Sequence, residues 1–150
     1  MAHTYVCLLF HVVFSTKNRE PHIDAEPKDR LVPYLGGVVR ELGGKALKIN
    51  GTADHVHMHL SLPATVAIAD AMCTIKTNSS RWVHEQWTSR ASFQWQTGYG
   101  AFTVSQSMSK AVTKYIVEQE KHHRGRTFQE EFLAMLEKHG VEYDERYIWE

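Results

Sequence analysis

The pattern that most constrains this chain is a run in which polar and apolar side chains alternate, Asp54-His55-Val56-His57-Met58-His59-Leu60. Successive side chains on a β-strand point to opposite faces of the sheet, so this alternation predicts a strand with one face in the core. Val56, Met58 and Leu60 then point into the core. The run therefore predicts a strand that carries three imidazoles on its other face.

Strand and helix patterns follow one another in a definite order along the rest of the chain. Hydrophobic stretches bounded by turn residues predict four strands, and apolar residues at helical spacing predict four helices. The predicted strands are residues 5–16, 45–52, 55–62 and 99–105, and the predicted helices are residues 24–42, 66–87, 107–119 and 128–140. The order indicates an α+β protein with a ferredoxin-like (RRM-like) βαββαβ antiparallel sheet. We expect helices on one face of that sheet, plus an additional C-terminal helix that bears Tyr115.

The composition fits one folded domain. A chain of 150 residues, 43% of them hydrophobic, is long enough to bury a core. Its apolar runs, such as residues 5–10, are far too short to cross a bilayer, and no export leader opens the sequence. Cys7 and Cys73 lie in apolar stretches and are interpreted as reduced core residues. These features predict a cytoplasmic protein with no membrane partner.

Charge is distributed unevenly, although the formal net charge is zero. Residues 1–127 carry 15 Lys and Arg against 10 Asp and Glu, whereas residues 128–150 carry 2 against 7. The body of the chain is therefore basic and its last segment acidic, which the total conceals. We expect residues 128–150 to form an acidic, aromatic helix and tail that packs on the same domain or on a dimer partner.

From the residues alone, the histidine strand has more than one interpretation. Same-face neighbours on a strand are close enough for two imidazoles to bind one metal ion, and imidazole binds Zn, Mn, Fe, Co, Ni and Cu. A solvent-facing strand whose polar positions happen to be histidine is the simpler interpretation. The pair alone does not exclude it, but three histidines that alternate in one strand, directly after Asp54, shift the balance toward a metal site at His55 and His57. A zinc site with His59 as third ligand is an alternative.

A second candidate group lies on the predicted helix of residues 107–119. Tyr115 and Gln119 are four residues apart and so share one helix face. A glutamine carbonyl can complete a metal shell. A phenol has a pKa of about 10, so Tyr115 needs a metal ion or a cation nearby to act as a nucleophile at neutral pH. Packing of Tyr115 in the core, in a stripe with Val112 and Ile116, is the alternative.

Four stretches carry a family resemblance: residues 11–19 (HVVFSTKNR), 54–57 (DHVH), 93–105 (FQWQTGYGAFTVS) and 115–119 (YIVEQ). In this order they resemble the single-tyrosine HUH transposases of the smallest bacterial insertion sequences, a family that includes the REP-associated tyrosine transposases. The resemblance covers most of the chain. It implies that residues 1–127 form an HUH transposase catalytic domain in a DNA-associated protein of the bacterial cytoplasm.

The resemblance also implies a reaction. His55, His57 and Gln119 would bind Mg2+ or Mn2+, and Tyr115 would attack the scissile phosphate to give a 5′-phosphotyrosine bond and a free 3′-hydroxyl. The covalent bond conserves the phosphodiester, so that rejoining needs no ATP. The implied substrate is single-stranded DNA at hairpin-flanked element ends. The implied assembly is a homodimer whose active site is shared between subunits.

Basic residues of the body are candidates for contact with the DNA backbone, which gives affinity without reading sequence. They are Lys17, Arg19, Lys76, Arg81, Lys110, Lys114, Arg124 and Arg126. Two alternatives to a strand transferase remain. One is a non-catalytic single-stranded nucleic-acid-binding domain, which would display aromatic side chains on its central strands. The other is the three-histidine zinc hydrolase, which would need His59.

Overall fold

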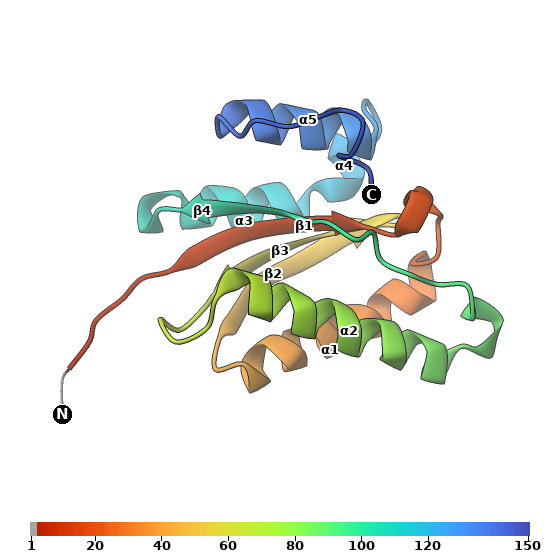
Figure 1. The fold of residues 1–150 in the computed structure, drawn as a ribbon, viewed down its shortest axis with the longest axis horizontal. Coiled ribbons are helices and arrows are strands. Elements are labelled where there is room, and N and C mark those ends of the chain that lie inside the picture. Colours follow the sequence, from red (N-terminus) through yellow and green to blue (C-terminus); the bar gives the residue numbers. More distant parts are fainter. Residues whose placement is uncertain (1–2) are drawn as a thin grey trace.

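Four strands form one open sheet in the computed structural model of the chain, which describes residues 3–150 (Figure 1). The sheet order is β2-β3-β1-β4, and every neighbouring pair is antiparallel. This order, with helices after β1 and after β3, is the ferredoxin-like arrangement, so the predicted fold is confirmed. The strands are β1 (Leu9–Ser15), β2 (Lys45–Thr52), β3 (His55–Ser61) and β4 (Gly100–Val104).

Helices cover both faces of the sheet. α1 and α2 lie on one face, and α3, α4 and α5 lie on the other (Figure 1). Their bounds are α1 (Ala25–Glu41), α2 (Ile68–Gln86), α3 (Ser109–Val117), α4 (Gln119–His122) and α5 (Phe128–Lys138), with short 3-10 turns η1 (Lys17–Arg19), η2 (Thr88–Arg90) and η3 (Gln106–Met108). Within the described residues, no helix combines the length and apolarity needed to cross a bilayer.

β3 lies in the interior of the sheet and is covered on both faces. It pairs with β2 on one side and with β1 on the other, where Ser15 stands opposite His55 and Val13 opposite His57. Met58 faces α1 and α2 as part of the main apolar core. The predicted alternation is therefore confirmed. The histidine face does not meet solvent, however, because α3, α4 and α5 lie over it (Figure 1).

The β2–β3 hairpin fixes where the histidine strand begins. Gly51 approaches the opposite strand so closely that a Cβ atom there would lie 2.1 Å from the His55 carbonyl oxygen. This close approach requires glycine. The turn is also tied to the end of β1, since the Thr16 backbone N–H donates to the Asp54 carbonyl at 2.8 Å. The two contacts set the register of β3 at its first histidine.

The acidic C-terminal segment packs on the sheet of its own chain. Phe128 and Phe132 of α5 join residues of β1 and β4 in a second, smaller apolar core. Trp149 adds its ring to this core, with its centroid 6.1 Å from that of Phe132. The chain end is held in place as well, because the Glu150 carbonyl accepts a hydrogen bond from the Gly98 N–H at 3.0 Å.

Two details differ from the sequence predictions. β1 begins at Leu9 rather than at Tyr5, because Leu9 pairs with the last residues of both neighbouring strands, and no paired strand reaches further toward the N-terminus. Cys7 therefore lies beyond the sheet and is exposed, and Cys73 is exposed on α2. Both cysteines are free thiols, but the prediction that they belong to the core is wrong.

Candidate active site

Two imidazoles form the base of a buried polar cluster on the α3–α5 face. The alternation of β3 directs both His55 and His57 to this face, and the exposed fraction of each is 0%. Their ring centroids lie 5.2 Å apart. Phe128 of α5 stacks on the His55 ring, with centroids 4.7 Å apart. A solvent-facing strand of incidental histidines is thereby excluded.

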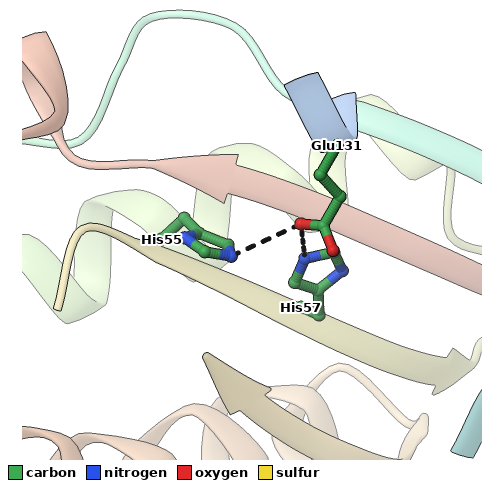
Figure 2. Close-up of side chains that lie close together, drawn as sticks. All are labelled: His55, His57 and Glu131. Atoms are coloured by element: carbon green, nitrogen blue, oxygen red, sulfur yellow. Dashed lines mark hydrogen bonds and ion pairs between the residues drawn. The ribbon is translucent and has the colours of Figure 1, made fainter. Parts of the chain in front are cut away.

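A carboxylate from α5 stands directly over the two imidazoles (Figure 2). One Glu131 oxygen lies 2.8 Å from His57 Nε2 and 3.5 Å from His55 Nε2. The same oxygen lies 3.1 Å from Nε2 of His123. The Gln119 amide donates to the second oxygen at 3.3 Å. Glu131 is fully buried, and this set of partners is what makes a buried carboxylate tolerable.

The predicted nucleophile and third ligand reach the same cluster. The Tyr115 hydroxyl donates a hydrogen bond to Glu131. The Gln119 amide oxygen lies 3.1 Å from His55 Nε2. The helix that carries them is not continuous, because α3 ends at Val117 and α4 starts at Gln119, after Glu118 adopts a backbone φ of −91° and ψ of 20°. The predicted one-turn spacing nevertheless places both side chains against the histidine pair.

Neighbouring side chains orient the two imidazoles. The Asp54 carboxylate lies 2.7 Å from Nδ1 of His55. Nε2 of His11, from β1, lies 2.8 Å from Nδ1 of His57. In both rings the Nδ1 atom is thus occupied, and Nε2 is directed toward the centre of the cluster. Such outer contacts fix the ring orientation of metal-binding histidines in proteins.

The electrostatics of the cluster keep the tyrosine neutral. Burial and the hydrogen bond to Glu131 raise the pKa of Tyr115 well above its usual range, although the nearby Arg126 guanidinium opposes this rise. The Arg126 guanidinium donates to the Tyr115 hydroxyl at 3.5 Å. Without a further positive charge, the phenol stays protonated at neutral pH.

The two imidazoles differ in their protonation. Burial disfavours a charged His55, but hydrogen bonds with Asp54 and Glu131 raise its pKa to about 9. Burial lowers the pKa of His57 to about 4, despite the neighbouring Glu131. Hydrogen bonds from the surrounding histidines, against the effect of burial, hold the pKa of Glu131 well below its usual range. The surroundings therefore favour the protonated form of His55 and the neutral form of His57, and a metal ion bound to both rings would require His55 to lose its proton.

This donor set fits a divalent metal ion. His55, His57 and Glu131 each offer one ligand atom, and these atoms lie within 4.8 Å of one another. The Gln119 amide oxygen, 3.1 Å from the His55 nitrogen, can supply a fourth. Two imidazole nitrogens with carboxylate and amide oxygens suit Mn2+ and other transition metals better than Mg2+, which prefers oxygen alone.

His59 does not join this group. Its Nδ1 atom lies 3.0 Å from the hydroxyl of Thr113 on α3, and its buried Nε2 atom has no hydrogen-bond partner. The described residues that could hold a metal together are His55, His57 and Glu131. The three-histidine zinc site is therefore not assembled in this structure.

The basic residues predicted to contact DNA are not brought together on one surface. Arg126 lies at the tyrosine, as described above, and Lys110 and Lys114 on α3 and Arg124 after α4 are exposed. Lys76 and Arg81 instead line a groove of about 860 Å3 beside α2, on the opposite face of the sheet, where the Lys76 amino group donates to the Gly98 carbonyl at 2.7 Å.

The remaining two predicted contacts, Lys17 and Arg19, belong to the short turn η1 after β1. Arg19 donates a hydrogen bond to the Trp149 carbonyl at 3.4 Å, and its guanidinium lies 5.6 Å from the centroid of the Trp149 ring. The side chain is thus held against the C-terminal segment. Lys17 is exposed.

Three participants were not predicted from the sequence. Glu131 and His123 lie outside every stretch that carries the family resemblance, and nothing in their spacing connects them to the histidine strand. His11 opens the first of those stretches, so its position within a quoted motif was a usable signal. The fold unites residues from β1, β3, α3, α4 and α5, which are far apart in the chain.

Comparison with known proteins identifies a family that this chain matches. The sequence model of the family described as "Transposase IS200 like" matches residues 4–119. The transposase for insertion sequence element IS200 of Salmonella typhimurium is 30% identical over 124 residues, covering 79% of this chain and 81% of that protein. The corresponding transposase of Salmonella typhi matches equally well.

Solved structures share the fold. A proposed transposase from Deinococcus radiodurans superimposes with a TM-score of 0.63 at 23% identity, covering 79% of this chain and 96% of that one. A REP-associated tyrosine transposase bound to a REP hairpin superimposes with a TM-score of 0.61 at 12% identity, covering 82% of this chain and 73% of that one. α5, with Glu131, lies beyond the residues that the family model matches.

Proposed function

Because the chain belongs to the IS200-like transposase family, we propose that it cuts and rejoins single-stranded DNA through a 5′-phosphotyrosine bond to Tyr115. One observation carries this proposal. The Tyr115 hydroxyl lies in one buried cluster with His55 and His57, hydrogen-bonded to the carboxylate that covers them. A tyrosine that served only as a packing residue would have no need of a buried carboxylate and two imidazoles.

These positions support the following reaction. Tyr115 attacks the phosphorus of the scissile phosphodiester, the Tyr115 oxygen–phosphorus bond forms, and the bond to the 3′ oxygen of the preceding nucleotide breaks. The released 3′-hydroxyl takes up a proton, and the phenol loses one. Arg126 is placed to stabilise the phenolate and the phosphate oxygens, since its guanidinium already donates to the Tyr115 hydroxyl. Attack by a 3′-hydroxyl on the phosphotyrosine reverses these steps and rejoins DNA.

His55, His57 and Gln119 are the proposed metal ligands, with Glu131 as a further donor. Mg2+ or Mn2+ bound there would polarise the scissile phosphate and stabilise the charge that develops on it. Asp54 and His11 hold the two imidazoles in the orientation that binding requires. Tyr115 must leave its hydrogen bond with Glu131 before it can attack, so Glu131 holds the nucleophile in a resting position.

The proposed substrate is single-stranded DNA next to a hairpin at the end of a mobile element, bound by a DNA-associated protein of the bacterial cytoplasm. The family membership supports DNA as the substrate. The fold shared with a REP-associated tyrosine transposase, solved with a REP hairpin, supports a hairpin as the recognised feature. Lys114, Lys110 and Arg124 are the basic candidates closest to Tyr115 along the chain, and Arg126 donates to its hydroxyl.

The experiment is incubation with labelled hairpin oligonucleotides from the flanks of the gene, followed by a denaturing gel. We expect a covalent protein–DNA band in Mn2+ that is absent in EDTA and absent in Tyr115→Phe. Tyr143→Phe, which removes an exposed hydroxyl, is the matched control and should form the band normally. A band of full intensity in Tyr115→Phe would refute the assigned nucleophile.

We also propose a homodimer whose active site is shared between subunits, as the family resemblance implies. In one chain Tyr115 lies against its own histidine pair, so sharing would exchange α3 between two copies, as in domain swapping. Mixing His57→Ala with Tyr115→Phe tests this, because only a shared site restores one intact site per dimer. Recovery of the covalent band after mixing supports sharing. A mixture as inactive as either variant alone would show that each chain uses its own tyrosine.

A further inference from the structure

A cleft opens between α3 and α5, next to the candidate nucleophile. Its volume is about 580 Å3. Residues of β1, β4, α3 and α5 and of the segments next to them line it, and both Tyr115 and Arg126 are among the lining residues. Tyr115 lines the cleft, and its hydroxyl donates to Glu131 of the buried cluster. The tyrosine therefore lies between the cleft and the cluster. A strand of DNA whose phosphate reaches Tyr115 would have an adjacent nucleotide at this cleft.

The charge of the cleft suits a nucleic acid. Its ionisable lining residues other than Tyr115 are His11, Arg126, Lys138 and His139, and none of the described residues that line it is acidic. This is notable because residues 128–150 are acidic overall, with 2 Lys and Arg against 7 Asp and Glu. Lys138, one of those two basic residues, belongs to the cleft. Positive charge is thus placed where a phosphate backbone would pass.

The shape of the lining suits a nucleobase. Met108, a large apolar side chain, lies at the cleft and leaves 49% of its surface exposed. The His139 ring is held by the Phe102 ring, with centroids 4.4 Å apart, and by the Met135 carbonyl, 2.7 Å from its Nδ1 atom. A fixed aromatic ring beside an apolar surface is the kind of platform on which bases stack without regard to sequence.

We propose that this cleft binds the nucleotide next to the scissile phosphate, with Lys138 and Arg126 on the backbone and Met108 and His139 against the base. The inference rests on the proposed function of Tyr115 and adds a binding site to it. It assigns a role to α5 and to the residue that follows it, which lie beyond the segment matched by the family model. The cleft then holds the strand so that the phosphate stays in line with Tyr115.

Two variants test the cleft, each with a matched control. Ala111→Trp places an indole in the cleft from an exposed position on α3, and Ala25→Trp adds the same side chain to an exposed position on α1. Lys138→Glu reverses a charge in the last turn of α5, and Arg40→Glu does the same in the last turn of α1. We expect Ala111→Trp to slow formation of the covalent adduct about tenfold, the loss from one base contact. Lys138→Glu should slow it through the lost contact with the backbone, and each control should leave it unchanged.

Cross-linking supplies a readout that does not depend on the rate. The 3′-hydroxyl fragment from wild-type cleavage locates the scissile phosphate, and 5-iododeoxyuridine is then placed on either side of it. Irradiation should attach the label to peptides that contain Met108 or His139, and Ala111→Trp should abolish this product. Because Lys138→Glu changes only an exposed side chain, it keeps the rate test valid if Ala111→Trp does not fold.

The outcomes separate the two proposals. If the wild type forms no covalent adduct, the proposed function fails. If the wild type forms the adduct but both cleft variants match their controls, or the label attaches only to peptides outside the cleft, the function stands and the cleft proposal is overturned.

Discussion

The two faces of β3 come from the same seven residues and behave in opposite ways. Met58 and its apolar neighbours pack under α1 and α2 in the main core. His57 and its neighbours lie under α3 and α5, where each buried polar group needs a partner. Burial of apolar surface stabilises the fold directly, whereas burial of charge is tolerated only through pairing. One strand is thus a source of stability on one face and the base of a buried polar cluster on the other.

The largest expected effect comes from the apolar face. Met58→Ala removes a fully buried side chain and should lower the free energy of unfolding by about 2–5 kcal/mol, through lost burial and the cavity that remains. Urea unfolding of the metal-free protein measures this change. The fraction that remains folded should bind Mn2+ as the wild type does. Loss of Mn2+ binding by folded Met58→Ala would show that the two faces are not separable.

Substitution of His57, the neighbouring residue on the other face, should remove the stabilisation by Mn2+ that Met58→Ala keeps. At a Mn2+ concentration 100 times its dissociation constant, we expect the wild-type free energy of unfolding to rise by about 2.7 kcal/mol. Met58→Ala should gain the same increment, because its ligands are intact. His57→Ala should gain little, since it lacks one of the two imidazoles. Thermal unfolding with Mn2+ and with EDTA measures the difference, and equal gains in all three proteins would exclude the assigned ligands.

A smaller effect is expected at the carboxylate above the histidines. Glu131→Gln keeps the shape of the side chain but leaves buried donors without their anionic acceptor, so the metal-free protein should lose about 1–3 kcal/mol. Glu142→Gln, an exposed change of the same kind in the same segment, is the control and should be nearly neutral. Calorimetric titration should also show weaker Mn2+ binding by Glu131→Gln. Unchanged Mn2+ binding would show that Glu131 has a role only in the metal-free protein.

The smallest effect is expected at the third histidine of β3. His59→Leu removes a buried ring nitrogen that has no partner and breaks one contact with Thr113. The gain and the loss offset each other, and the free energy of unfolding should change by less than about 1 kcal/mol. Formation of the covalent adduct should continue at the wild-type rate. Loss of bound metal in His59→Leu would revive the three-histidine site.

Local patterns predicted most of the fold. The bounds of β2 agree with the prediction, and the ends of α1 differ from it by one residue, because a turn and a glycine stop mark them in the sequence. The start of β1 could not be predicted in the same way. Residues 5–8 have the composition of a strand, but pairing ends where the neighbouring strands end. Strand length depends on partners that a local pattern does not contain.

The residues of the candidate site divide in the same way, into those that a local pattern predicts and those that depend on tertiary packing. His55 and His57 were predicted because alternation in one strand places them together, and Tyr115 and Gln119 because helical spacing does. Glu131 was missed, because it reaches the cluster only when α5 packs over the imidazoles, on the side away from β3. An acidic residue in an acidic segment gives no local signal of burial. Only tertiary packing distinguishes it from Glu130, its exposed neighbour.

The packing of Phe128 on His55 also has a consequence for the rate at which a metal ion could bind at the proposed site. Both imidazoles have an exposed fraction of 0%, so an ion in solution has no direct path to their Nε2 atoms while α5 is in place. For a metal ion to reach the proposed ligands, α5 would have to lift from the sheet. In a stopped-flow experiment, the observed rate should therefore rise with Mn2+ concentration only to a plateau. The height of that plateau is the opening rate of α5.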